Sequence, residues 1–465
     1  MNDVRKQLFY EQKNGYDLLS RDDHLASEDY CRGYMAFLND SRTEREAVSN
    51  AVALARENGF AEFKPGMELR PGMKLYQVNR GKAMMLAVIG KKSLAEGAVI
   101  AGAHIDSPRL DLKQLPLYET DELCYLRTHY YGGIKKYQWV TIPLELHGVV
   151  ALRSGETVDV CIGREPGDPR FVITDLLPHL AQDQMKKTMS EGITGEGLHI
   201  LIGSVPYADE GEDRVKLAVM SILNDLYGIT EEDFLSAEIE VVPAGKSRDF
   251  GLDRSMVMGY GHDDRVCAYA EIEAMFQITG TPQYTCCCIL ADKEEIGSVG
   301  ATGMQARYFE NAMAEIMDKT GEYSELKLRR ALNNSRMLSC DVSAGFDPSY
   351  AGMFEKKNAA YLGRGVCFNK YTGSRGKGGS NDANAEYLGK LRAIMDDNKV
   401  CFQTAELGKV DQGGGGTIAY ICALYGMNVI DSGVAVLSMH APWEIISKAD
   451  LYEAVKAYHA FLLNA

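Results

Sequence analysis

The chain has 465 residues, of which 46% are hydrophobic and 25% charged, and its formal net charge is −15. A chain of this length is too long for one hydrophobic core, so we expect at least two domains. The excess of acidic residues argues against a nucleic-acid partner, because a surface that binds the phosphate backbone is basic. No run approaches the roughly 18 apolar residues of a membrane span, and the amino terminus lacks the apolar stretch of a signal peptide.

The cysteines indicate a reducing environment. There are 11 of them, an odd number, and no Cys-x-x-Cys pair occurs. We therefore expect a reduced, cytoplasmic protein. The run Cys286-Cys287-Cys288 resembles a thiolate metal site. Adjacent strand residues point to opposite faces, however, so these three side chains are expected to serve as small core hydrophobes.

The predicted elements begin with helices over the first 60 residues. Thr43 and Glu46 fit a capping box, and Asn58-Gly59 fits a helix stop. The segments Lys74–Val78 and Met84–Ile89 predict a hairpin. An apolar strand ending at His104 follows it.

The pattern of polar and apolar residues changes over residues 114–246. Alternating polar and apolar residues there predict half-solvated antiparallel strands. We therefore expect an α/β catalytic domain made of residues 1–113 and 247–465, with a β-rich domain inserted between them. In the second part of the catalytic domain, residues 263–278 fit a helix, and Asp450 fits the cap of a last helix.

Side chains that bind divalent metals follow four short apolar runs. The runs end near His104 and Asp106, Glu294 and Glu295, Asp341, and His440. Each run reads as a buried strand, and ligands of open α/β sheets bind at the carboxyl ends of the strands. The sequence therefore predicts a metal site at one edge of a sheet.

Several of these acidic residues have both a functional and a purely structural interpretation. Asp106 is positioned to orient His104, as metal-binding histidines require. In the pair Glu294-Glu295, one carboxylate can bind a metal while the other accepts protons, although a solvated acidic turn is the commoner fate. Asp263 and Asp264 open a helix, where one of them either caps it or bridges two ions.

The same residues carry a resemblance to the M18 family of dinuclear metallo-aminopeptidases, the aspartyl-aminopeptidase group. The matching blocks are Ala103-His104-Ile105-Asp106-Ser107-Pro108-Arg109, Pro178-His179-Leu180-Ala181, His262-Asp263-Asp264-Arg265, Asp292-Lys293-Glu294-Glu295-Ile296-Gly297-Ser298, Asp341, Thr417-Ile418 and Leu437-Ser438-Met439-His440. They span most of the chain in the order of the family.

The resemblance implies a zinc-peptidase-like catalytic domain, an inserted dimerisation domain and a set of residue roles. His104 and Asp341 would bind one divalent ion, Glu295 and His440 the other, and Asp263 would bridge them. Glu294 would be the general base that activates a metal-held water, and Asp106 would steer His104. Oxygen and nitrogen ligands suit Zn²⁺, and also Co²⁺ or Mn²⁺.

The family also implies assembly. Its inserted domain builds dimers, and the dimers form a tetrahedral dodecamer in which a histidine reaches into the site of a neighbouring subunit. His179 matches that histidine and would stabilise the oxyanion there. The expected function is removal of amino-terminal residues from peptides. The rival functions are a metal-dependent deacylase of N-acyl amino acids and an assembly or cargo protein on the same fold.

Two departures from the family bear on the substrate. After Asp341 the chain lacks the family's His-Pro-Asn stretch, and Gly413-Gly414-Gly415-Gly416 replaces a Pro-Cys-Gly-Ser segment. Asp347 would repel an acidic side chain, whereas Lys370 could attract one. We expect a preference for neutral or basic amino-terminal residues. A nucleotide site at Lys377 is excluded, because the phosphate loop needs Ser or Thr directly after its Lys.

Overall fold

The computed structural model describes residues 3–208, 210–373 and 375–465. The chain forms two units. The first consists of Met1–Asp106, Ser247–Met439 and Glu444–Ala465, and the second of Ser107–Lys246 with His440–Trp443. The sequence pattern placed the first domain boundary at residue 114. Strand β5 (Arg109–Thr120) spans that position, and the second unit begins at Ser107.

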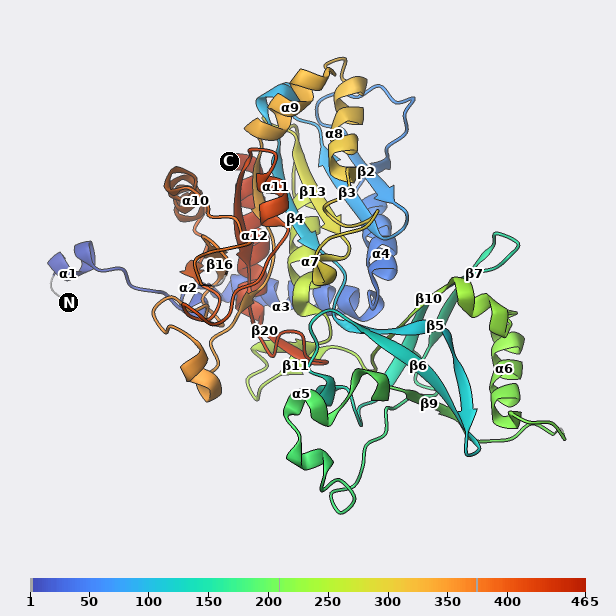
Figure 1. The fold of residues 1–465 in the computed structure, drawn as a ribbon. Coiled ribbons are helices and arrows are strands. Elements are labelled where there is room, and N and C mark those ends of the chain that lie inside the picture. The colour runs from blue at the N-terminus through green and yellow to red at the C-terminus, as the bar shows by residue number, and fades with distance from the viewer. Residues whose placement is uncertain (1–2, 209, 374) are drawn as a thin grey trace. The chain divides into compact units, whose positions relative to one another are not determined.

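The first unit is built on a nine-stranded mixed sheet (Figure 1). In spatial order its strands are β1 (Ala61–Glu62), β2 (Lys74–Asn79), β3 (Ala83–Val88), β13 (Cys286–Ala291), β4 (Val99–His104), β14 (Arg336–Ser339), β18 (Asn428–Gly433), β16 (Val366–Asn369) and β17 (Phe402–Ala405). The central strands β13, β4, β14 and β18 are parallel, so their carboxyl ends meet at one edge.

Helices cover both faces of this sheet, because its central strands are apolar on both sides. One core forms against α3 (Arg21–Asp40), α4 (Glu44–Glu57), α7 (His262–Phe276), α10 (Ala385–Asp397) and α12 (Lys448–Asn464). The other forms against α8 (Tyr308–Lys319), α9 (Glu325–Asn334) and α11 (Ala419–Ala423). The short helices α1 (Asp3–Leu8) and α2 (Gly15–Leu18) precede α3. The predicted α/β class is confirmed.

The three consecutive cysteines alternate between the two cores, as predicted. Cys286 and Cys288 lie in the core that contains α7, and Cys287 lies in the opposite core. Burial raises the pKa of all three thiols, which therefore remain protonated. They pack as small hydrophobes and do not converge on an ion.

A five-stranded sheet completes the first unit and corrects one prediction. Its order is β11 (Arg248–Phe250), β12 (Met256–Gly259), β20 (Glu444–Ser447), β19 (Ala435–Leu437) and β15 (Ser343–Ala344). The run before His440 was expected to join the other three ligand-bearing strands in one sheet, and that is wrong. It forms β19 in the smaller sheet, since β18, just before it, already occupies the place beside β14.

The second unit contains an antiparallel six-stranded sheet. Its order is β8 (Thr157–Ile162), β7 (Leu144–Ala151), β10 (Ala237–Pro243), β5, β6 (Leu123–Tyr131) and β9 (Ile200–Gly203). The same unit contains the helices α5 (Met189–Gly192) and α6 (Arg214–Tyr227). This unit is therefore built mainly of antiparallel strands.

Local sequence signals identified the start of α4 and the first hairpin, but not the cap of the last helix. Thr43 and Glu46 form the predicted capping box at the start of α4, and β2 and β3 form the predicted hairpin. Asp450 does not cap α12, however, because Ser447 occupies the cap position. The Asp450 carboxylate instead accepts hydrogen bonds from the backbone N–H groups of Gly363 and Gly365.

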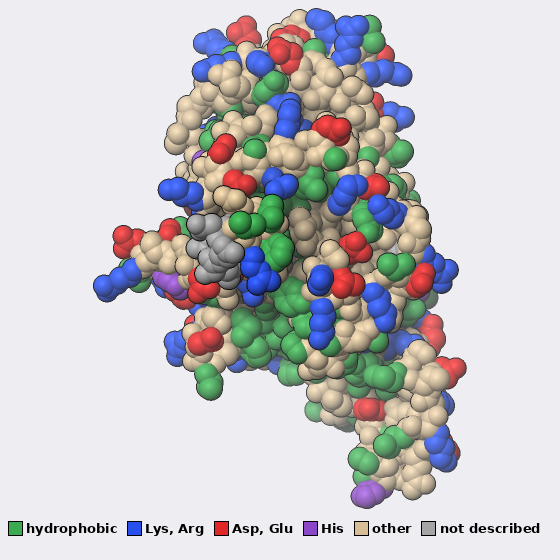
Figure 2. All heavy atoms as spheres, turned by 90° about the vertical axis from the view of Figure 1, so that its left-hand side faces the viewer, with side chains coloured by type: hydrophobic (Ala, Val, Ile, Leu, Met, Phe, Trp, Pro, Cys, Tyr) green, Lys and Arg blue, Asp and Glu red, His purple; other side chains and the backbone are tan. Residues whose placement is uncertain are grey.

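The surface shows no strong separation of charge on the face drawn in Figure 2. Lys and Arg side chains are interspersed there with Asp and Glu, and hydrophobic side chains gather in the middle. Among the described residues, no helix is long and apolar enough to cross a membrane.

Candidate metal centre

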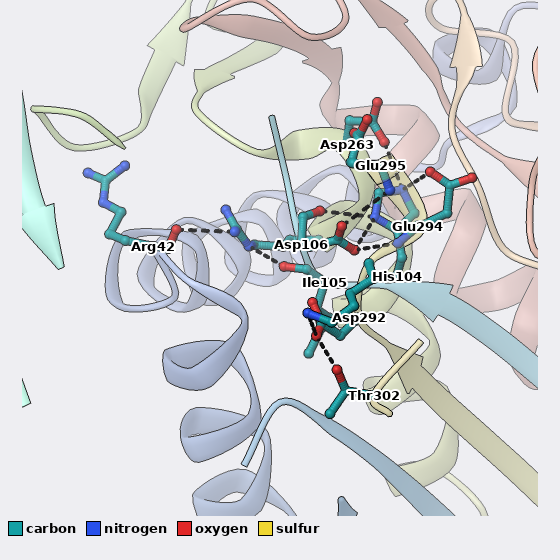
Figure 3. Close-up of polar contacts among 11 residues, drawn as sticks. Arg42, His104, Ile105, Asp106, Asp263, Asp292, Glu294, Glu295 and Thr302 are labelled. Carbon is teal, nitrogen blue, oxygen red and sulfur yellow. Dashed lines mark hydrogen bonds and ion pairs between the residues drawn. The ribbon is translucent and has the colours of Figure 1, made fainter. Parts of the chain in front are cut away.

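Three neighbouring parallel strands deliver acidic and histidine side chains to one edge of the central sheet. Strand β4 ends at His104, which is paired in register with Ala291, the last residue of β13. A single helical turn, Glu294–Ile296, follows β13, and Asp341 follows β14. Asp263 and Asp264 enter from the first turn of α7, and the peptide bond between them is cis. Figure 3 shows His104 between Asp263, Glu294 and Asp106.

His104 is buried and carries two sets of acidic contacts. Its Nε2 atom lies 3.1 Å from Asp263 Oδ1 and 3.9 Å from Glu294 Oε2. Its Nδ1 atom lies 3.0 Å from the carbonyl oxygen of Asp106 and 3.4 Å from Asp106 Oδ1. Burial by itself lowers the pKa of His104, but the hydrogen bonds to Asp106 and Asp263 raise it well above its usual value. A cation bound at Nε2 would take the place of the proton there, while Nδ1 keeps the proton that it donates to Asp106.

Asp106 does more than orient the histidine ring. Its Oδ1 accepts the backbone N–H of Glu294 at 3.1 Å, and its Oδ2 accepts that of Glu295 at 3.2 Å. The fully buried carboxylate thereby fixes the turn that carries both glutamates. Sequence reasoning predicted only the contact with His104, because the connection to the glutamate turn spans 188 residues of chain.

The described residues form two groups that could hold a metal ion. The first comprises His104, Asp263 and Glu295, and the second His104, Asp264 and Asp341. Within each group one ligand atom per residue lies within 4.8 Å of the others. Glu294 belongs to neither group. The family resemblance assigned a ligand role to Asp263 and none to Asp264, yet Asp264 lies in the second group.

These residues fit divalent cations. Both carboxylate oxygens of Asp264 are buried and without a hydrogen-bond partner of ordinary geometry. Burial, and next the charge of Asp341, raise the pKa of Asp264 well above its usual value. Burial and then Glu294 do the same for Asp341. A cluster of buried acids that cannot all ionise alone becomes stable when cations compensate the charge. The nitrogen and oxygen donors suit Zn²⁺ as well as Co²⁺ or Mn²⁺.

A buried glutamate missed by sequence reasoning holds the backbone of this centre. Glu444 is 1% exposed, and its Oε2 accepts the backbone N–H of Asp263 at 3.0 Å. It begins β20, four residues after His440, so it stands close in sequence to a motif that was recognised. No local pattern distinguishes it from an ordinary strand residue.

The two remaining predicted site histidines lie in the second unit. His440 Nδ1 is 3.1 Å from the carbonyl oxygen of Gly133. His179 is exposed in a turn between Leu177 and Ala181. The roles of both, as a metal ligand and as an oxyanion donor, remain predictions.

Comparisons with known proteins identify a family. Residues 37–462 match the model of a family described as aminopeptidase I zinc metalloprotease (M18). A protein of Clostridium acetobutylicum named probable M18 family aminopeptidase 1 is 56% identical over 98% of this chain and 99% of its own length.

Solved structures share the fold. The crystal structure of an M18-family aminopeptidase from Thermotoga maritima is 43% identical, has a TM-score of 0.94 and covers 98% of this chain and all of its own. A dodecamer of mApe1 from Saccharomyces cerevisiae is 18% identical with a TM-score of 0.76, over 93% of this chain and 96% of its own. At that identity the yeast structure shows likeness of fold alone.

Proposed function

Because this chain belongs to the M18 family of zinc-dependent aminopeptidases, we propose that its buried acidic centre hydrolyses the bond after the amino-terminal residue of peptides, with Glu294 as general base. The assignment rests on one observation, which is that the two adjacent glutamates differ in their relation to the possible metal ligands. Glu295 lies in a group of possible ligands, and Glu294 stays outside both groups.

We assign two divalent ions, most simply Zn²⁺, to this centre. His104 and Asp341 would hold one, Glu295 and His440 the other, and Asp263 would bridge them. When bound, the ions would act as Lewis acids on the scissile carbonyl and on the attacking water. The two groups of possible ligands support this assignment, since both contain His104 and together they contain Asp263, Glu295 and Asp341.

Glu294 is suited to move the proton. Its side chain is 14% exposed, so water reaches it, while Asp106 fixes its backbone. In the proposed reaction the Glu294 carboxylate takes a proton from water as the water oxygen attacks the peptide carbonyl. The same proton then passes to the leaving amine as the C–N bond breaks, which returns Glu294 to its ionised form.

The test compares two adjacent variants. Glu294→Gln should lower kcat by about 10²–10⁴-fold, the usual worth of a general base, and keep the metal content of the wild type. Glu295→Gln is the matched control and should lose bound metal, because it removes a charge from a ligand. Metal loss from Glu294→Gln, or a kcat near that of wild type, would overturn the assignment. Faster cleavage of N-acylated than of free-amine substrates would favour a deacylase.

We also propose that the chain works in the cytoplasm as a tetrahedral dodecamer built from dimers. The yeast mApe1 structure of the same fold is a dodecamer. The second unit exposes apolar side chains on both sides of His179, with Leu177 and Leu180 51% and 69% exposed. All 11 cysteines are free thiols, which suits a reducing compartment.

Subunit mixing tests the shared site that this assembly implies. His179→Ala and Glu294→Gln subunits, each inactive, should regain activity when refolded together, because some dimers would hold one intact composite site. A role for His179 at an oxyanion is worth on the order of 10²-fold or more in rate. Mixed assemblies that form without regaining activity would show that His179 serves only its own subunit.

A further inference from the structure

Arg265 is a buried cation beside a site built to receive cations. It follows Asp263 and Asp264 directly in α7 and is 1% exposed. Its Nε donates to the carbonyl oxygen of Ile105 at 3.1 Å, and its Nη2 donates to the carbonyl oxygen of Arg42 at 3.1 Å. The guanidinium also lies 5.6 Å from the ring centre of Tyr260. None of these partners is a carboxylate.

The two carbonyl groups belong to segments that frame the metal centre. Ile105 lies between His104 and Asp106 (Figure 3). The hydrogen bond from Arg265 to the Ile105 carbonyl oxygen therefore fixes the short backbone from which both side chains project. Arg42 lies in the link between α3 and α4, just before the cap residue Thr43. Arg265 thus joins the end of β4, the link between α3 and α4, and the turn of α7 that carries the acidic pair.

This arrangement gives the two metal-binding groups a common support. Both groups contain His104, and each takes one acid from the turn that Arg265 ends. The geometry points to Arg265 as a positioning residue for metal binding, which it serves by locking the backbone of residues 104–106 to that of residues 263–265. The inference rests on the proposed metal-dependent function.

If its positive charge were the main influence, Arg265 would weaken metal binding. A buried positive charge near the site repels incoming cations, so its removal should tighten metal binding if charge were the main influence. If position is the main influence, its removal should weaken metal binding. Residues that orient metal ligands typically change affinity by about 10–100-fold when replaced. The sign of the change therefore distinguishes the two accounts.

Lysine is the informative substitution. Arg265→Lys keeps the charge but loses the planar fork that reaches two carbonyl groups at once. We expect Zn²⁺ affinity about 10–100-fold below wild type for Arg265→Lys, and at least as low for Arg265→Met. Affinity would be measured on the full-length protein by competition with a chromophoric chelator, alongside circular dichroism and thermal unfolding with and without excess Zn²⁺.

Lys448→Met provides the matched control for a buried cation. Lys448 is 2% exposed and pairs with Glu28 at 2.6 Å and Asp249 at 3.0 Å. Its replacement should lower thermal stability yet leave Zn²⁺ affinity unchanged, because it contacts no residue of either metal group. If Lys448→Met weakened Zn²⁺ binding as much as Arg265→Lys, the effect would be general destabilisation and the inference would fail.

The remaining outcomes are equally decisive. A folded Arg265→Lys with wild-type Zn²⁺ affinity, or an Arg265→Met with tighter binding, would overturn the positioning role. Failure of the wild type itself to bind Zn²⁺, Co²⁺ or Mn²⁺ would instead refute the proposed function. If Arg265→Met fails to fold, Arg265→Lys still decides, since it retains the volume and charge of the buried group.

Discussion

Replacement of Asp106 by Asn tests whether the Asp106 carboxylate positions Glu294, the proposed general base. In the structure each oxygen of the Asp106 carboxylate accepts one backbone N–H, that of Glu294 at 3.1 Å and that of Glu295 at 3.2 Å. An asparagine keeps one acceptor oxygen but turns its NH₂ group toward the other N–H. One charge-assisted hydrogen bond is lost and a buried donor meets a donor.

The expected loss follows from the strength of that bond. A hydrogen bond to a charged group is worth about 1.5–3 kcal/mol, and each 1.36 kcal/mol is tenfold in rate. If the misplaced turn costs this energy mainly in the transition state, kcat should fall about 10- to 150-fold. The assay is steady-state hydrolysis of an aminoacyl p-nitroanilide at saturating Zn²⁺, with metal content measured on the same sample.

Asp450→Asn is the matched control, because Asp450 is also fully buried and accepts two backbone N–H groups, from Gly363 at 2.7 Å and Gly365 at 2.6 Å. It should cost stability and leave kcat unchanged. The reasoning would be refuted by a metal-replete Asp106→Asn enzyme with the kcat of wild type. An equal loss of kcat in Asp450→Asn would also refute it.

Three further predictions concern the metals, the substrate and pH. Asp263→Ala should reduce the content of both ions and Asp264→Ala should spare at least one; metal analysis showing the reverse would exchange their roles. Lys370 pairs with Asp382, which also holds Lys377 at 3.2 Å, so the charge of Lys370 is offset. Wild type should therefore favour neutral or basic amino-terminal residues, and Asp382→Asn should raise the relative kcat/KM for acidic ones; an acidic preference in wild type would contradict this. Burial raises the pKa of Asp450 from 3.8 to about 7, so its stabilising contribution is full below pH 3.8 and is lost as the pH rises through about 7. Urea unfolding between pH 5 and 8 should show a smaller decline for Asp450→Asn, and equal slopes would count against it.

The sequence by itself determined the features that depend on neighbours along the chain. The capping box of Thr43 and Glu46, the hairpin of β2 and β3, and the alternation of Cys286–Cys288 each follow from the local geometry of a helix or strand. The same holds for His104 and Glu294-Glu295 as site candidates, since each lies at or just after the end of an apolar run that reads as a buried strand. The family resemblance added the expected roles.

Only the tertiary structure decided which distant residues support these candidates. The bonds from Asp106 to the glutamate turn, from Glu444 to Asp263 and from Arg265 to Ile105 join positions more than 150 residues apart. Sheet order also assigned the strand before His440 to the smaller sheet, because β18 pairs with β14. The alternation of apolar and polar residues along a strand predicts which face of the sheet each side chain lies on. The choice of the neighbouring strand depends on packing across the whole unit.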